Sequence, residues 1–243
     1  MTTETLEHRA LAAIRFLDEE TRQPVRAPLK LSGDGMRFVR NLRGLHVLTD
    51  APGFSDYADS YDLPETPPPT ATFTITASDP SHTYLARRFT VQLPRDPTPG
   101  ADEDLPSDSV FKPVEVLLYP SPVARASAGS AVVRLTVTDN ADKPLAGALV
   151  ELTLETPSIV RRGLSDERGE AQIQLPGIPI ADWADPAVTN EFDLSVKAAW
   201  AAGTEPPNPD ALAASLLPVA GVSIQVTTGA EVARTIKLTW ITS

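Results

Sequence analysis

The sequence contains no cysteine among its 243 residues. This absence excludes disulfide bonds, thiolate metal sites, iron–sulfur clusters and cysteine nucleophiles. The sequence also lacks an apolar run of the ~20 residues that a membrane-spanning helix needs. Its first residues are polar and acidic, unlike the basic and then apolar start of a secretory signal. We therefore expect cytoplasmic synthesis without a Sec signal, no membrane insertion and no disulfide partner.

Motifs for catalysis and nucleotide binding are also missing. The sequence has no Gly-x-Ser-x-Gly elbow, no Gly-x-x-x-x-Gly-Lys phosphate loop and no dinucleotide-binding Gly-x-Gly-x-x-Gly loop. The histidines, His8, His46 and His82, are far apart, and none begins a zinc-binding His-Glu-x-x-His arrangement. We therefore expect no enzymatic activity, no cofactor and no metal ion. The alternation of His46 with apolar neighbours predicts a strand residue that faces solvent, and His82 is expected in a turn.

Basic residues are scarce, with 21 Lys and Arg against 32 Asp and Glu and a formal net charge of -11. Nucleic acid phosphates and anionic membranes attract basic surfaces, so nucleic acid is not an expected partner. Proline is abundant, at 24 residues. Because proline lacks a backbone N–H, it is excluded from helix interiors and central strands and belongs at turns, edges and linkers.

Apolar and polar residues alternate in many short segments, which is the period of a half-buried β-strand. Such segments follow a strand that begins near residue 12 and occur at 29–31, 45–47, 73–77, 89–93, 110–119, 131–138, 147–155, 170–175, 191–199, 222–227 and 234–241. Asp210 to Leu217 predicts a short helix with Asp210 as its N-cap. The pattern predicts an all-β protein of antiparallel sandwiches with at most one or two short helices.

One β-rich passage occurs twice, roughly 120 residues apart. Asn41-Leu42-Arg43-Gly44 in the first copy stands where Asp166-Glu167-Arg168-Gly169 stands in the second. Pro120-Ser121-Pro122 reads as a linker between the copies. We therefore expect two tandem domains: residues 1–121, a degenerate copy with Pro-rich and acidic loops, and residues 122–243.

Acidic and aromatic residues provide the candidate sites. The segments 139–142 and 102–108 favour an ordinary turn and a solvated loop over calcium binding. Trp183, Trp200 and Trp240 favour core or edge packing over stacking on a ligand. A third segment interleaves two tyrosines with three carboxylates, which predicts an exposed interaction surface, although tyrosine is also common at sheet margins. That surface comprises Asp56, Tyr57, Asp59, Tyr61 and Asp62.

The second copy contains Lys143-Pro144-Leu145-Ala146-Gly147-Ala148-Leu149-Val150 and Gly163-Leu164-Ser165-Asp166-Glu167-Arg168-Gly169-Glu170-Ala171. From about residue 130 to 240 it resembles carboxypeptidase regulatory-like domains. The resemblance implies a noncatalytic, transthyretin-like (immunoglobulin-like) Greek-key β-sandwich in each copy. The join Val116-Leu117-Leu118-Tyr119-Pro120-Ser121-Pro122 is similar to proteins encoded beside phage-tail-like contractile injection particles. There, such sandwiches occur in tail, cap or baseplate accessory components.

Three classes of function follow from these observations. The leading hypothesis is a structural or adaptor protein that contacts other protein subunits of a larger assembly, in a particle assembled in or released from the cytoplasm. The alternative is a carbohydrate- or ligand-binding accessory module. An enzyme is the third class, and it would need carboxylates such as Asp56, Asp59 and Asp166 to converge in one pocket.

Overall fold

The computed structural model describes residues 9–59, 67–98, 100–101, 105–156, 158–178, 191–203 and 205–239. The chain divides into two compact units. Unit 1 comprises Met1–Leu17, Gln23–Ala77 and Arg88–Leu117, and unit 2 comprises Asp18–Arg22, Ser78–Arg87 and Leu118–Ser243. Two turn segments from the first half of the sequence thus belong to unit 2. The domain boundary expected between residues 121 and 122 stays a prediction.

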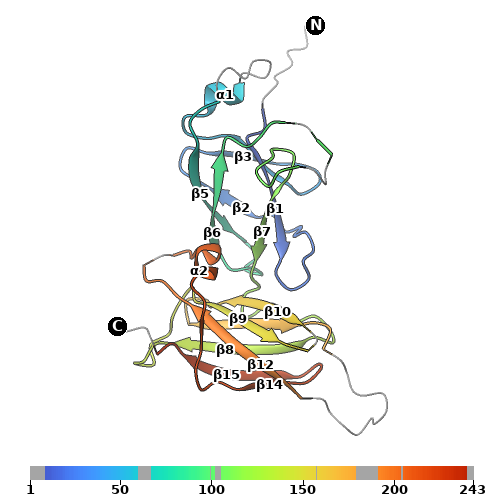
Figure 1. The fold of residues 1–243 in the computed structure, drawn as a ribbon, viewed down its shortest axis with the longest axis vertical. Coiled ribbons are helices and arrows are strands. Elements are labelled where there is room, and N and C mark those ends of the chain that lie inside the picture. The colour runs from blue at the N-terminus through green and yellow to red at the C-terminus, as the bar shows by residue number, and fades with distance from the viewer. Residues whose placement is uncertain are drawn as a thin grey trace. The chain divides into compact units, whose positions relative to one another are not determined.

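The first half of the chain forms two sheets (Figure 1), with strand orders β3-β4-β1-β7 and β2-β5-β6. Its elements are β1 (Ala12–Asp18), β2 (Lys30–Ser32), β3 (Arg37–Arg40), β4 (His46–Asp50), α1 (Ser55–Asp59), β5 (Ala71–Ser78), β6 (Arg87–Leu93) and β7 (Val114–Leu118). The alternating residues of these strands place apolar side chains on one face. Phe16 of β1 packs edge-on against Phe89 of β6, with ring centroids 5.8 Å apart, so the inner faces of the two sheets share one core.

His46 corrects one expectation. It was predicted to face solvent, but it lies in β4 with 5% of its surface exposed and packs edge-on against Phe16 at 5.4 Å. Its neighbour Val47 is only partly buried. The core-facing and solvent-facing positions of this strand are therefore the reverse of those predicted. Side chains of a strand alternate between its two faces, so an error of one residue in the assignment moves every side chain to the other face.

The second half also forms two sheets, with strand orders β10-β9-β12-β13, where β14 also pairs with β12, and β11-β8-β15. Its elements are β8 (Ala131–Thr138), β9 (Leu149–Leu154), β10 (Ile159–Leu164), β11 (Glu170–Leu175), β12 (Phe192–Ala199), α2 (Pro209–Ala213), β13 (Leu217–Pro218), β14 (Ile224–Val226) and β15 (Glu231–Lys237). One buried cluster joins both sheets and includes Val133 and Leu135 of β8 and Leu152 of β9. The all-β class is confirmed, with two short helices among the described residues.

One strand pair departs from the expected antiparallel arrangement. β15 runs parallel to β8, with Glu231 opposite Val132 and Lys237 opposite Thr138. β15 follows β14, which belongs to the other sheet, so the chain crosses between the sheets before it reaches β8. Parallel neighbours require such a crossover, whereas antiparallel neighbours can be joined by a short turn.

Helix α2 is shorter than predicted and begins at a different residue. Its N-cap is Asn208, whose side chain accepts hydrogen bonds from the backbone N–H groups of Asp210 and Ala211, at 3.2 and 3.4 Å. Asp210, the expected cap, lies in the first turn instead. Pro209 follows Asn208 at a position where a proline fits the start of a helix. Within the described residues no helix is long and apolar enough to cross a membrane.

The repeated motif forms the same turn in both halves. In the first copy, Asn41 Oδ1 accepts hydrogen bonds from the N–H groups two and four residues later, at 3.0 and 2.9 Å. Asp166 Oδ1 accepts the equivalent two bonds at 2.9 and 2.9 Å. Gly44 and Gly169 close these turns with positive φ values of 83° and 75°, which glycine tolerates best. The two motifs, which stand at equivalent places in the repeat, therefore form equivalent turns.

Candidate interaction site

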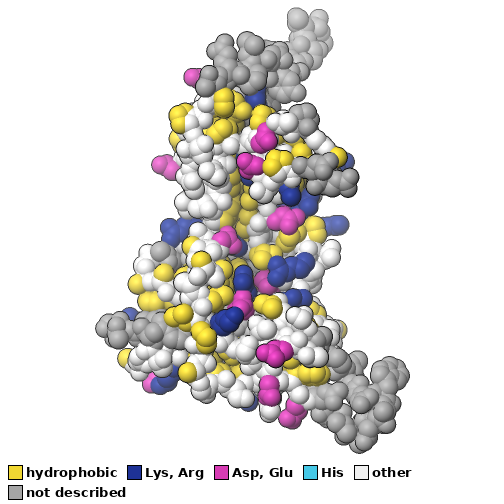
Figure 2. Space-filling model, viewed as in Figure 1, with side chains coloured by type: hydrophobic (Ala, Val, Ile, Leu, Met, Phe, Trp, Pro, Cys, Tyr) yellow, Lys and Arg dark blue, Asp and Glu magenta, His cyan; other side chains and the backbone are white. Residues whose placement is uncertain are grey.

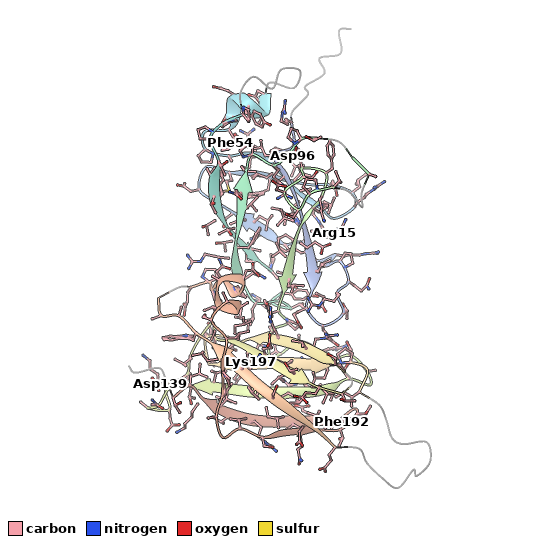
Figure 3. The ribbon with its side chains drawn as sticks, in the orientation of Figure 1. Arg15, Phe54, Asp96, Asp139, Phe192 and Lys197 are labelled. Atoms are coloured by element: carbon pink, nitrogen blue, oxygen red, sulfur yellow. The ribbon has the colours of Figure 1, made fainter. Side chains whose placement is uncertain are left out.

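Helix α1 carries the part of the predicted interaction surface that the structure describes. The preceding Pro52-Gly53 turn places Phe54 in the core, and the Ser55 hydroxyl donates to the Asp50 carboxylate at 2.8 Å. Along this one-turn helix, Ala58 faces inward and Asp56 and Asp59 are exposed. Tyr61 and Asp62 lie outside the described residues. Figure 3 shows Phe54 next to α1.

The Tyr57 side chain contacts Arg9, the first residue that the structure describes. The Arg9 guanidinium lies over the Tyr57 ring, 4.5 Å from its centroid, and Arg9 Nη1 donates to the Tyr57 hydroxyl at 3.2 Å. The Arg9 backbone N–H also donates to the carbonyl of Ala58 at 2.8 Å. A guanidinium in this position is attracted by the ring electrons. These contacts hold the Arg9 and Tyr57 side chains against each other.

Arg95 is the second cation of this region, and it is 9% exposed. Its Nε and Nη2 donate to the carbonyls of Ser107, Ser109 and Lys112 at 2.9 to 3.2 Å. Arg95 thereby holds the loop that leads into β7. Among the described residues no carboxylate lies within ion-pair distance of it. Burial lowers the pKa of Arg95 below its ordinary value, and the attraction of Asp108 acts in the opposite direction.

Arg9, Tyr57 and Arg95 line one cavity of about 400 Å³ in unit 1. Its apolar lining includes Leu11, Val110 and Phe111, together with prolines. Phe111 is 57% exposed, which is unusual for a phenylalanine. The cavity lies within the size range of small-molecule and side-chain pockets. We call this cavity, with the residues that line it, the Arg95 cavity.

The sequence indicated only one member of the Arg95 cavity, Tyr57. Arg9, Arg95 and Phe111 are supplied by segments far apart in the chain, so no local spacing marks them. Phe111 was expected in a strand over residues 110–119, directly after the acidic loop 102–108 that was predicted to be solvated, but it precedes β7 and is exposed. Asp102 to Asp104 of that loop lie outside the described residues, and Asp108 is exposed.

Other candidate residues are engaged in the fold. Asp139 Oδ1 accepts backbone hydrogen bonds from Ala141 and Lys143 at 2.8 and 2.9 Å, which confirms its predicted turn role. His82 lies in a turn, as expected, and its N–H donates to the carbonyl of Asp79. Within the described ranges, no group of three or more His, Asp or Glu side chains is placed to hold a metal ion.

The tryptophans allow one comparison with expectation. Trp200 packs against the core of unit 2, and its indole N–H donates to the carbonyl of Ala146 at 2.8 Å. This confirms the predicted packing role. Trp183 and Trp240 lie outside the described residues, so their packing role stays a prediction.

Unit 2 contains a second cavity, a groove of about 620 Å³. Two of the carboxylates that line it, Asp79 and Asp166, already accept backbone hydrogen bonds in turns. Asp166 also pairs with Arg168 at 3.1 Å. The fold therefore already uses both of these acids.

Unit 2 also buries an acid. Glu19 is 2% exposed, pairs with Arg22 at 3.0 Å and accepts the backbone N–H of Arg162 at 3.1 Å. Burial raises the pKa of Glu19 to about 7, and this effect outweighs the opposing attraction of Arg22 and Arg161.

On the face of the molecule drawn in Figure 2, acidic and basic side chains are interspersed.

No protein-family model matches this sequence, and no curated protein matches it either. Several solved structures are similar at low identity. The Bacillus anthracis TIE protein is 12% identical with a TM-score of 0.24, covering 94% of this chain and 34% of its own. This chain therefore spans about a third of the TIE protein's length.

Two pilins are also similar. GBS52, the minor pilin of Streptococcus agalactiae, is 11% identical with a TM-score of 0.27, covering 96% of this chain and 97% of its own. BcpA, the major pilin subunit of Bacillus cereus, is 13% identical with a TM-score of 0.25, covering 95% of this chain and 59% of its own. All these TM-scores are below 0.5, so we base no functional conclusion on them.

Proposed function

We propose that this protein is a non-enzymatic structural adaptor, which binds another protein subunit through the Arg95 cavity and the adjacent helix α1. The observation that carries this proposal is the composition of the cavity, where Tyr57 and the exposed Phe111 accompany two arginines. Tyrosine, phenylalanine and arginine are enriched in protein interfaces, and aromatic and arginine side chains supply most of their binding energy.

The engagement of several acidic side chains in turns supports the same proposal. Asp79, Asp139 and Asp166, which otherwise are candidates for acid–base chemistry, each accept backbone hydrogen bonds in turns. A catalytic acid or base needs a site from which it can reach a substrate. Acids that are engaged in the turns of unit 2, together with an aromatic and arginine-lined cavity in unit 1, suit binding better than catalysis.

The resemblance of the segment Val116 to Pro122 supports a more specific proposal. The assembly is a phage-tail-like contractile injection particle, assembled in the cytoplasm, and the chain is a cap, tail or baseplate accessory component. The other proposal, a carbohydrate- or ligand-binding module, has weaker support because the charged side chains that line the cavity are arginines rather than the carboxylates or amides that commonly bind sugars.

Co-purification tests the adaptor proposal. The full-length chain is tagged and purified from its native cell extract at moderate salt, and the proteins that accompany it are quantified by mass spectrometry. We expect subunits at fixed ratios to the wild type and loss of at least one of them with Phe111→Ala. Val39→Ala is the matched control, because Val39 is a comparably exposed apolar residue of unit 1.

Each outcome has a distinct meaning. Sheath, tube or baseplate proteins in fixed ratio support the particle component. Recovery of the chain alone, with retention on a glycan column, contradicts the adaptor proposal and supports the binding module. Equal recovery of partners with Phe111→Ala and with the wild type contradicts the assignment to the Arg95 cavity.

A further inference from the structure

The Arg95 cavity has charge of one sign. Among the described residues that line it, the charged side chains are Arg9 and Arg95. A lining of two arginines in a chain with a net charge of -11 runs against the overall charge of the protein. Local charge of this kind favours an anionic group in the cavity.

Arg95 has a hydrogen-bond donor available for that group. Its Nε and Nη2 are used by loop carbonyls, whereas Nη1 makes no hydrogen bond within the described part of the chain. A carboxylate at Nη1 is both an acceptor and a counter-ion for this buried cation. Hydrogen bonds between ionised groups are stronger than neutral ones, and removal from water strengthens them further. Burial lowers the pKa of Arg95, and the attraction of Asp108 does not offset this effect, so a further anion beside the guanidinium would stabilise its charge.

The remaining walls favour an apolar neighbour to the carboxylate. Leu11, Val110 and the exposed ring of Phe111 border the cavity on the apolar side. Burial of such a ring under a ligand side chain is favourable by about 25 cal/mol per Å² of apolar surface. One carboxylate next to one aromatic or large aliphatic side chain therefore matches both parts of the lining.

Acidic residues near the cavity limit the negative charge that a bound partner segment can carry. Asp56 and Asp59 on α1 are exposed, and Asp96 and Asp108 lie in the segments that flank the cavity. Figure 3 shows Asp96 in this part of unit 1. These acids repel a polyanion such as nucleic acid or a polyacidic tract, but they tolerate one carboxylate that reaches the arginines. A protein segment supplies a single acid with an apolar neighbour.

We infer that the Arg95 cavity binds an acidic residue and an adjacent aromatic or large aliphatic residue from an extended segment of the partner subunit. This inference rests on the proposed adaptor function and names the chemistry that the site recognises. In the complex, the carboxylate contacts Arg95 Nη1 and the apolar side chain packs on Phe111.

A pair of labelled peptides tests the inference with the full-length protein. The probe is a fluorescent, capped peptide Gly-Ser-Phe-Asp-Ser-Gly, and its control has Asn in place of Asp. Binding is measured by fluorescence polarisation from low to moderate NaCl. We expect the Asp peptide to bind at least about tenfold more tightly than the Asn peptide, with an affinity that falls as salt rises, because one charge-assisted contact separates them.

Three variants locate the binding. Phe111→Ala and Arg9→Gln are each expected to weaken binding of the Asp peptide, and Arg95→Gln is expected to abolish the preference for Asp over Asn. Arg15→Gln is the matched control, because Arg15 is a partly exposed arginine of unit 1 that pairs with Glu115 outside the cavity. Circular dichroism of each variant confirms that the fold is kept.

Equal binding of the two peptides, or binding of neither, overturns the inference, as does binding unaffected by both Phe111→Ala and Arg9→Gln. Displacement of the Asp peptide by phenylacetate as effectively as by unlabelled peptide overturns the assignment to a protein segment. If Phe111→Ala loses its partner in co-purification while the two peptides bind equally, the adaptor proposal stands and the acidic segment is wrong.

Discussion

The turns at Asn41 in unit 1 and at Asp166 in unit 2 make the same hydrogen bonds in different surroundings. An added Cβ on Gly44 meets only the end of the Arg40 side chain, 3.9 Å away. On Gly169 it would lie 2.6 Å from the carbonyl oxygen of Val137. The local bonds of the turn thus come from its own sequence, whereas packing against the neighbouring strand makes glycine a strict requirement in unit 2 alone.

The units also differ in the titratable group that they bury. Unit 1 buries His46, and burial together with the nearby Arg40 lowers the pKa of that imidazole. Unit 2 buries Glu19, and burial raises the pKa of that carboxyl. Burial disfavours the charged form in both cases, so it moves a base and an acid in opposite directions. The two units should therefore respond oppositely to acid.

The largest expected difference between the turns comes from Ala in place of each glycine. Gly169→Ala should lower the free energy of unfolding of unit 2 by about 3 kcal/mol, because it combines a positive φ with a backbone clash. Gly44→Ala should cost unit 1 only about 1 kcal/mol, from the positive φ alone. The sequence places all three tryptophans in unit 2, so urea unfolding by tryptophan fluorescence measures the first variant. Hydrogen exchange of β3 and β4 measures the second. Equal losses would contradict the difference in packing.

Glu19 sets a pH dependence of similar size. Its carboxyl has a pKa of about 7 in the folded protein against the ordinary 4.5, so the folded state binds this proton more tightly. The resulting stabilisation is complete below about pH 4.5 and is lost as the pH rises through about 7. Glu19→Gln should remove this loss, which amounts to at most about 3 kcal/mol between pH 5 and 8.

Urea unfolding at pH 5 and 8, again by tryptophan fluorescence, measures the Glu19 effect. The exposed Glu167→Gln serves as the control and should keep the pH dependence of the wild type. A wild type whose stability does not fall between these pH values relative to Glu19→Gln would show that Glu19 is charged throughout.

Removal of the turn acceptors should have a smaller effect. Asp166→Ala leaves two backbone N–H groups without their acceptor and removes an ion pair, so we expect a loss of about 2 kcal/mol. Asn41→Ala removes two similar bonds at an exposed site, where water replaces them, and should cost about 1 kcal/mol. The same two measurements as for the glycines apply, and a larger loss for Asn41→Ala would reverse the ranking.

His46 provides the remaining contrast. Because the folded-state pKa of His46 lies below the ordinary 6.5, its contribution to stability is present above pH 6.5 and is lost as the pH falls. Hydrogen exchange of β1 and β4 should therefore speed up below pH 6.5, after correction for intrinsic rates. His46→Leu should reduce this acceleration, and an unchanged pH response would exclude His46 as its source.

The sequence was informative where structure is local. The turn at Asp139 and the all-β class follow from side-chain chemistry and a period of two, and the structure confirms them. His46 was assigned to the wrong face because one polar residue in a short strand does not show which alternate positions face the core. In the structure, the imidazole of His46 packs in the core against Phe16.

Long-range features were beyond the sequence. The parallel pairing of β15 with β8 depends on a crossover between sheets, and the Arg95 cavity joins residues from separate segments. Tyr57 was identified because it stands among carboxylates, but the arginine that stacks on it is 48 positions away. Only the folded chain brings such residues together.

The parallel pair β8 and β15 also affects when the protein can fold during translation. β8 is synthesised by residue 138, but the strand that covers its edge ends at Lys237. Until the ribosome has released that strand, β8 has an unpaired edge next to an incomplete apolar core, which is a typical site of wrong strand pairing. Slow translation of the 3′ part of the message would prolong this interval. The yield of folded protein should therefore depend on the speed with which the last strand is made.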